Sequence, residues 1–143
     1  MMISTKGKYA LQTMVDLAQH ATCCDCSFSD CVSLKDIAER QNISMKYLEA
    51  IVSLLNKGGL VKSTRGKDGG YRLSRPANEI TVAEVMAMTE GSLAPVSCLN
   101  TCADGQCVHA DSCLTLPLWQ KLDTMIDSYL SAITIQDIVD RRV

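Results

Sequence analysis

Aromatic side chains are scarce in this chain: they make up 4% of 143 residues, with one Trp and one Phe. Seven Met among many Leu, Ile and Ala favour a helical core instead. No apolar run approaches the roughly 18 residues of a transmembrane helix. The first eight residues also lack the apolar stretch of a secretion signal. We therefore expect a cytoplasmic protein without a membrane span.

Catalytic motifs are missing as well. No Ser–His–Asp set and no paired-carboxylate site stands out. The glycine-rich residues 66–70 lack the following helix that a nucleotide-binding loop requires. These absences argue against an enzyme. The composition, 47% hydrophobic and 21% charged, suits one small globular domain with room for a dimerisation extension.

Charge is unevenly distributed along the chain. The net charge of −2 alone argues against a nucleic-acid-binding protein. Residues 44–76, however, contain seven Lys and Arg and two acidic residues. Residues 91–143 contain three Lys and Arg and six acidic residues. The sequence therefore predicts a basic surface for an acidic partner and an acidic tail.

The first half of the chain has the pattern of a helix-turn-helix. Apolar spacing predicts a helix over residues 5–21. Ser33 begins a second helix, and Ser44 is a good N-cap for a third that reaches Lys57. A tight turn at residues 41–43 joins the second helix to the third, which is the arrangement of a helix-turn-helix.

A basic hairpin follows these helices. Residues 60–65 and 71–74 are expected to form two short strands joined by residues 66–70. Glycine at this density marks a tip that needs positive φ or close approach to another molecule. A helix-turn-helix followed by a basic hairpin is a winged helix, so we expect a mainly α fold with a small β-hairpin wing.

The second half predicts a cysteine-rich loop and a long helix. Thr81 opens a helix that ends near Thr89, and residues 91–112 are expected to be irregular. Pro117 begins a long helix, and Thr134 is expected to cap a last short one. The expected units are a DNA-binding domain (1–90), a cysteine-rich loop (91–116), and a dimerisation helix with tail (117–143).

The long helix carries a continuous apolar stripe. We expect part of the stripe to cover the first helix and the rest to meet a second subunit. A symmetric homodimer also suits double-stranded DNA with two half-sites. The stripe consists of Leu118, Leu122, Met125, Ile126, Tyr129, Leu130 and Ile133.

Candidate DNA contacts lie on the third helix and the wing. Lys46, Tyr47 and Glu49, with Ala50, lie outside the apolar stripe of the helix that would enter the major groove. On the wing, Arg65 would enter a minor groove. Lys62, Lys67 and Arg72 would contact phosphates. The alternative is a solvated helix face beside an ordinary surface hairpin.

Eight cysteines in a cytosolic chain indicate metal or redox chemistry. Four of them lie within sixteen residues, at Cys98, Cys102, Cys107 and Cys113. The five residues between the last two are a wide gap for structural zinc, and iron–sulfur sites accept more varied spacing. From the spacing, an iron–sulfur cluster is favoured, with zinc, a reversible disulfide and inert thiols as alternatives.

Several segments together resemble a known family. They include TKGKYA at residues 5–10, SMKYLE at 44–49, TVAEV at 81–85 and CLTLPLW at 113–119, with the wing glycines between them. In combination they are similar to the bacterial winged-helix iron–sulfur regulators of the Rrf-two family, which has IscR, NsrR and CymR types. The pattern is closest to the IscR type.

This resemblance implies a homodimeric transcription regulator with a three-cysteine cluster loop near the dimer interface. A cluster in the loop, most simply 2Fe–2S, would alter promoter affinity by its presence or redox state. Cys98, Cys107 and Cys113 match the family's three cysteines, and Cys102 is additional. The family's base contacts fall at Lys46, Tyr47 and Glu49, and its minor-groove arginine at Arg65.

The sequence departs from the family pattern at the fourth ligand. Leu116 occupies the position of a ligand His in the IscR type, and Lys8 that of an acidic residue in the NsrR type. Cys102, His109 or a group from elsewhere therefore remain open as the fourth ligand. Of these, Cys102 is favoured because its thiolate lies in the same loop.

We expect a repressor under cluster control, which can lose its cluster on purification. The alternative is a regulator of cysteine or sulfur metabolism that responds to thiol oxidation or a metabolic-enzyme partner, with zinc or no metal. A second cysteine group could be another metal or redox site, supply a ligand across the dimer, or be an insertion without a role. This group consists of Cys23, Cys24, Cys26 and Cys31.

Overall fold

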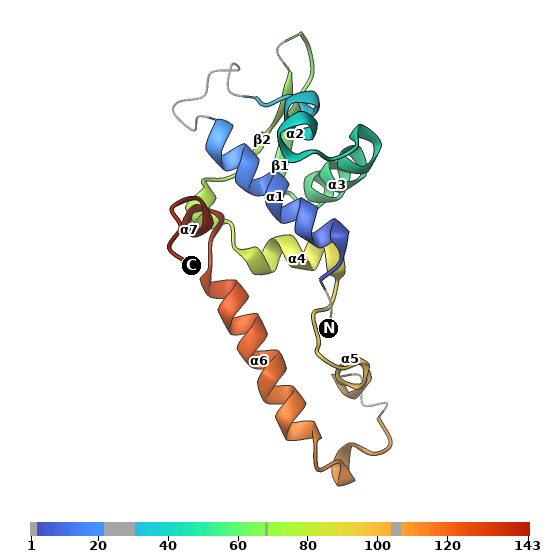
Figure 1. Cartoon of the computed structure of the whole chain (residues 1–143). Helices are drawn as coiled ribbons and strands as arrows, with labels where there is room; N and C mark the ends of the chain where they lie inside the picture. The colour runs from blue at the N-terminus through green and yellow to red at the C-terminus, as the bar shows by residue number, and fades with distance from the viewer. Residues whose placement is uncertain (1–2, 22–30, 68, 104–106) are drawn as a thin grey trace.

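The computed structural model describes residues 3–21, 31–67, 69–103 and 107–143, without the side chains of 101–103. It shows a mainly helical chain with one two-stranded antiparallel sheet. The winged-helix head contains α1, α2, α3, β1 and β2, and the long helix α6 extends away from it (Figure 1). The predicted fold class is confirmed. No helix of the described chain combines the length and hydropathy of a membrane span.

Three serine-capped helices build the head. The hydroxyls of Ser4, Ser33 and Ser44 each accept a hydrogen bond from a first-turn backbone N–H. Such caps satisfy amide groups that have no partner within the helix. The helices are α1 (Thr5–His20), α2 (Leu34–Gln41) and α3 (Met45–Lys57).

The core of the head lies around α1. Met14 and Leu17 of this helix are completely buried, as are Leu48 and Ile51 of α3. In contrast, α2 buries only Ile37 and Ala38 of its eight residues. Apolar packing therefore anchors α3 more firmly than α2.

The wing is a short hairpin that a third segment extends. β1 (Val61–Thr64) pairs with β2 (Gly70–Leu73), and Gly66 at the tip has a φ of 122°. Val32 exchanges two backbone hydrogen bonds with Tyr71, of 2.9 and 2.8 Å. A Cβ at Gly70 would lie 2.7 Å from the carbonyl carbon of Val32. The expected positive φ at the tip is therefore confirmed at Gly66. The close approach at Gly70 is to another segment of the same chain.

The connection to α4 follows the wing. The 3₁₀ turn η1 (Ala77–Glu79) leads to α4 (Val82–Glu90), which begins with a capping box between Thr81 and Glu84. At its other end, Glu90 accepts hydrogen bonds from the backbone N–H and hydroxyl of Ser4, at 3.2 and 2.6 Å. α4 is thus tied to the start of α1.

The expectation that residues 91–112 are irregular is wrong. They contain α5 (Ser97–Ala103) and a 3₁₀ turn, η2 (Ala110–Ser112). Pro95 precedes the first turn of α5, where the Leu99 N–H donates to the carbonyl oxygen of Val96. A helix of seven residues is too short to display a clear apolar period, so the sequence pattern did not indicate it.

The chain ends with α6 (Leu116–Ala132) and α7 (Ile135–Val139). All of α6 is described and none of its residues is buried. The expectation that part of its stripe covers the first helix is wrong: α6 packs against α4, and α7 packs against α1. Ile135 is fully buried, and its N–H donates to the carbonyl oxygen of Ile80. The predicted cap at Thr134 is confirmed.

Candidate functional site

The first turns of α3 present an exposed polar face. Lys46, Glu49 and Ala50 are exposed, whereas Tyr47 is half-buried and packs against the core. The Ser44 hydroxyl accepts the Tyr47 N–H at 3.3 Å, which fixes the start of the helix. The predicted base-contact residues therefore share one accessible end of α3.

Two side chains of α1 continue this surface. The rings of Tyr9 and Tyr47 meet edge to face, with centroids 5.9 Å apart and planes at 80°. The Nζ of Lys8 lies 5.9 Å from the centroid of the Tyr9 ring. Sequence reasoning did not find this group, because α1 lies outside the helix-turn-helix pattern.

The wing brings two predicted phosphate contacts together. Lys62 on β1 and Arg72 on β2 are directly opposite in the register, and both are exposed. Like charges at opposed positions of two strands destabilise a sheet, and an anion between them removes the repulsion. Arg65 and Lys67 are exposed at the tip. Four cations therefore line one small hairpin.

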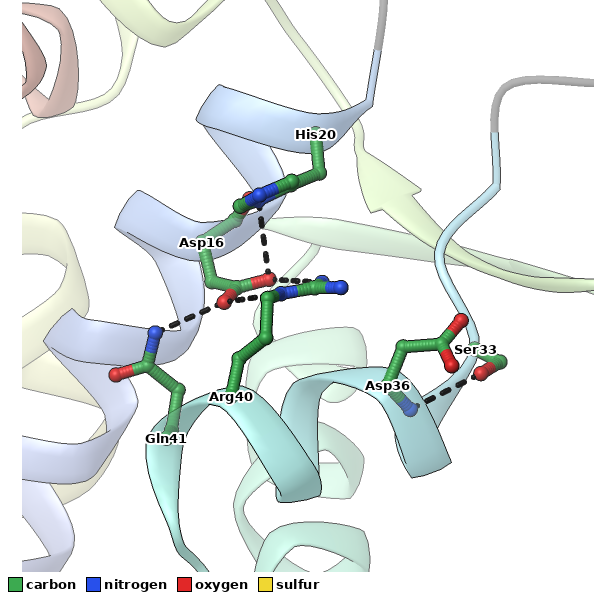
Figure 2. A network of polar contacts seen from close by, with 6 residues as sticks. All are labelled: Asp16, His20, Ser33, Asp36, Arg40 and Gln41. Atoms are coloured by element: carbon green, nitrogen blue, oxygen red, sulfur yellow. Dashed lines mark hydrogen bonds and ion pairs between the residues drawn. The ribbon is translucent and has the colours of Figure 1, made fainter.

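A buried carboxylate joins α1 to α2. Asp16 is fully buried and accepts hydrogen bonds from Arg40 at 2.6 and 3.0 Å and from Gln41 at 2.8 Å (Figure 2). Nδ1 of His20 lies 3.5 Å from the same carboxylate. Burial alone would raise the pKa of Asp16, but the bonds from Arg40 and Gln41 and the charge of Arg40 outweigh it and lower the pKa.

The predicted cluster ligands lie in three separate segments of the chain. Cys98 lies in α5, Cys107 precedes η2, and Cys113 precedes α6, each partly accessible. Cys102 also lies in α5, but its side chain is outside the described part. Within the described residues, no three Cys, His, Asp or Glu side chains are placed to hold a metal ion. The structure therefore does not bring the described thiols Cys98, Cys107 and Cys113 together as one set of metal ligands.

Cys113 has the environment of a stabilised thiolate. Its Sγ lies 3.5 Å from the hydroxyl of Thr115. Hydrogen bonding by that hydroxyl, and then by the Thr115 and Leu116 backbone N–H groups, lowers the pKa of the Cys113 thiol below its ordinary value. Because thiolates rather than thiols bind metals, this environment suits Cys113 as a metal ligand. His109, the alternative fourth ligand, is exposed.

A hollow of about 340 Å³ lies beside the thiol loop. Ala87 of α4, Leu99 of α5 and Ile126 of α6 contribute to its wall. Two carboxylates of α6, Asp123 and Asp127, also line it. The hollow shows that α4, α5 and α6 leave unfilled space between them at these residues.

The second cysteine group is described only at Cys31, since Cys23, Cys24 and Cys26 lie outside the described residues. The Cys31 thiol donates to the hydroxyl of Thr64 at 3.4 Å. This contact places the end of the group beside β1, next to the wing.

Comparisons with known proteins agree on one family. The Rrf2 family model, described as an iron-dependent transcriptional regulator, matches residues 3–141. The regulator IscR of Photorhabdus laumondii is 41% identical over 142 residues, which cover 99% of this chain and 81% of that protein. Solved structures of an IscR and a CymR protein are also similar to this chain.

The structure of T. potens IscR has a TM-score of 0.71 and 37% identity, covering 100% of this chain and 89% of that one. CymR of B. subtilis, described as a global cysteine regulator, has a TM-score of 0.81 and 32% identity, covering 99% and 98%. These relatives are transcription regulators and not enzymes. From its sequence and its fold, the chain belongs to the Rrf2 family of transcriptional regulators.

Proposed function

We propose that this regulator is a homodimeric repressor that binds double-stranded DNA through α3 and the wing, in the cytoplasm. We further propose that an iron–sulfur cluster held by Cys98, Cys107 and Cys113 controls its promoter affinity. Cys102 is the proposed fourth ligand. The two parts of the proposal rest on different observations.

The opposed cations Lys62 and Arg72 are the observation that supports DNA binding. Their repulsion is unfavourable in the free protein, and a backbone phosphate would relieve it. The exposed end of α3 supplies Lys46 and Glu49, which match guanine acceptors and the cytosine amino group. Arg65 at the tip has the small neighbours that entry into a minor groove requires.

The chemistry of the ligands supports the cluster part. Thiolates bind iron–sulfur clusters, and the donors around Cys113 already favour its thiolate form. When bound, such a cluster supplies a redox-active group whose loss or oxidation can be sensed. To meet on one group, Cys98 in α5 and Cys107 must approach Cys113 at the start of α6.

The chain also offers a route from the thiols to the DNA-binding head. The hollow beside α5 leaves space for that helix to move relative to α4 and α6. At the far end of α6, the N–H of Val82 donates to the carbonyl oxygen of Ile133. A coupling of about 1–3 kcal/mol between the loop and the head would change DNA affinity roughly 5- to 150-fold.

The direct test is anaerobic purification followed by absorption spectroscopy and counts of iron and sulfide per chain. We expect brown protein with near-equal iron and sulfide, and Cys107→Ala should lose the colour while keeping the wild-type far-UV circular dichroism. Cys31→Ala, outside the loop, is the matched control and should stay brown. A Cys107→Ala protein with a full cluster would remove that ligand from the proposal.

The similarity to CymR favours a second candidate function. The chain would then regulate cysteine or sulfur metabolism, through thiol oxidation or a metabolic-enzyme partner, with zinc or no metal. The separation of the three thiols in the described residues is compatible with this function. Colourless protein that cannot be reconstituted, with stoichiometric zinc or a reversible disulfide, would select it.

A further inference from the structure

On the proposed DNA-binding surface, Tyr47 of α3 packs against an aromatic side chain of α1. Its ring packs edge to face against the ring of Tyr9, with the ring centroids 5.9 Å apart and the ring planes at 80°. Both tyrosines are half-buried and pack against the core. Edge-to-face packing restricts how a ring can turn. Tyr9 therefore holds the Tyr47 ring in one orientation at the start of α3.

Lys8 adds a charge to this pair. The residue is exposed, and among the described residues its ammonium group has no carboxylate partner within ion-pair distance. It lies 5.9 Å from the centroid of the Tyr9 ring. A contact of this kind at an exposed site is weak, so the lysine side chain remains available to a stronger, anionic partner.

Distance decides which anion Lys8 can reach. The two centroid distances place its ammonium within about 12 Å of the Tyr47 ring. The major groove is about 12 Å wide and bounded by phosphates. An ammonium within this distance of a side chain in the groove can therefore reach a phosphate at the edge of the groove.

Resting on the proposed DNA binding, we propose that the DNA-contacting surface extends from α3 onto the first turns of α1. Lys8 contacts a backbone phosphate, and Tyr9 is a positioning residue that orients Tyr47 toward the bases. Lys8 contributes affinity that is independent of sequence, whereas Tyr9 contributes to discrimination between sequences.

The test of Lys8 uses the salt dependence of binding to a mixed-sequence duplex, measured by fluorescence anisotropy. Each phosphate contact contributes about 0.9 to the slope of log K against log salt concentration. For a homodimer, Lys8→Ala should therefore reduce the slope by about 1.8, with an unchanged sedimentation coefficient. Lys121→Ala, an exposed charge deletion on α6, should keep the wild-type slope.

A wild-type slope for Lys8→Ala would overturn the phosphate contact. A change in the oligomeric state of Lys8→Ala would also overturn it, because Lys8 would then belong to a protein interface. If the wild-type protein itself showed no salt-dependent binding, the proposed DNA function would fail. These results are distinguishable from one another.

The test of Tyr9 compares a duplex that the wild-type protein enriches from a random pool with a mixed-sequence duplex. Tyr9→Leu should lower the affinity ratio between them about 5- to 20-fold and keep the salt slope. Tyr9→Phe retains the ring and should restore the ratio. A Tyr9→Leu protein that is folded at the assay temperature and keeps the wild-type ratio would overturn the positioning role.

Discussion

At the scale of single residues, the fully buried Asp16 carboxylate depends on its partners. A buried charge is tolerated when hydrogen bonds and an opposite charge replace the water that it loses. Arg40 and Gln41 supply these groups from the last turn of α2 (Figure 2). Since α2 buries only two apolar side chains, these hydrogen bonds to Asp16 are an important part of its attachment to α1.

Replacing Asp16 by Asn should lower the free energy of unfolding by about 2–3 kcal/mol, because the hydrogen bonds to charged Arg40 are weakened. Urea titration with a circular dichroism readout measures this loss. Asp36→Asn is a matched control in the same helix pair, since its carboxylate lies in the exposed first turn of α2. That control should cost less than about 0.5 kcal/mol.

The same residue predicts a pH dependence. The pKa of Asp16 is lower in the folded protein than its ordinary value of 3.8. Its stabilising contribution is therefore fully present above that value and is lost as the pH falls toward the folded pKa. Unfolding titrations between about pH 6 and pH 3 should show a smaller acid-induced loss for Asp16→Asn than for the wild type. Parallel curves for the two proteins would contradict this role.

At the scale of elements, the wing depends on one close backbone approach. A Cβ at Gly70 would meet the backbone of Val32, which pairs with the neighbouring Tyr71. Gly70→Ala should therefore break this pairing and cost about 1–3 kcal/mol. Ser63→Ala, an exposed change on the partner strand, is the control and should be near neutral.

Thermal unfolding measures the stability of both wing variants, and anisotropy with a mixed-sequence duplex measures their DNA binding. Gly70→Ala should bind more weakly because the opposed cations Lys62 and Arg72 lose their fixed separation. Unchanged stability would show that the third segment can move aside. A destabilised Gly70→Ala variant that keeps full DNA affinity would show that DNA binding does not depend on the geometry of the wing.

Local signals were sufficient to predict most elements from the sequence. Helix starts depend on a hydroxyl and the amide groups next to it, so the caps at Ser33, Ser44 and Thr134 are visible in a few residues. The helix α5 was missed because seven residues carry little periodicity. The contacts of Tyr9 with Tyr47 and of Asp16 with Arg40 were missed because they join segments distant in sequence.

At the scale of the whole molecule, α6 exposes an apolar stripe. Three of its apolar side chains are largely exposed: Leu118 at 60%, Met125 at 59% and Tyr129 at 62%. Leu122, between Leu118 and Met125 in the sequence, is 37% exposed. They are three or four residues apart and share one face of the helix. A second copy of the chain is the partner that we propose for this face.

Met125→Glu should therefore shift the protein toward a monomer, because a carboxylate at the centre of the stripe would be desolvated in the interface. Sedimentation velocity over a concentration series measures this shift. Gln120→Glu adds the same charge on the other side of α6 and should leave the assembly unchanged. A dimeric Met125→Glu protein would show that another surface pairs the subunits.

The attachment of α6 to the head at one end has a mechanical consequence. At 1.5 Å per residue, its 17 residues form a rod about 25 Å long. The backbone bonds of Ile133 and Ile135 hold one end to the head, and Cys113 precedes the other. By simple leverage, a displacement of about 2 Å at the cysteine end corresponds to a tilt of about 5° at the attached end. A small movement at one sulfur atom would thus be delivered to the head as a rotation.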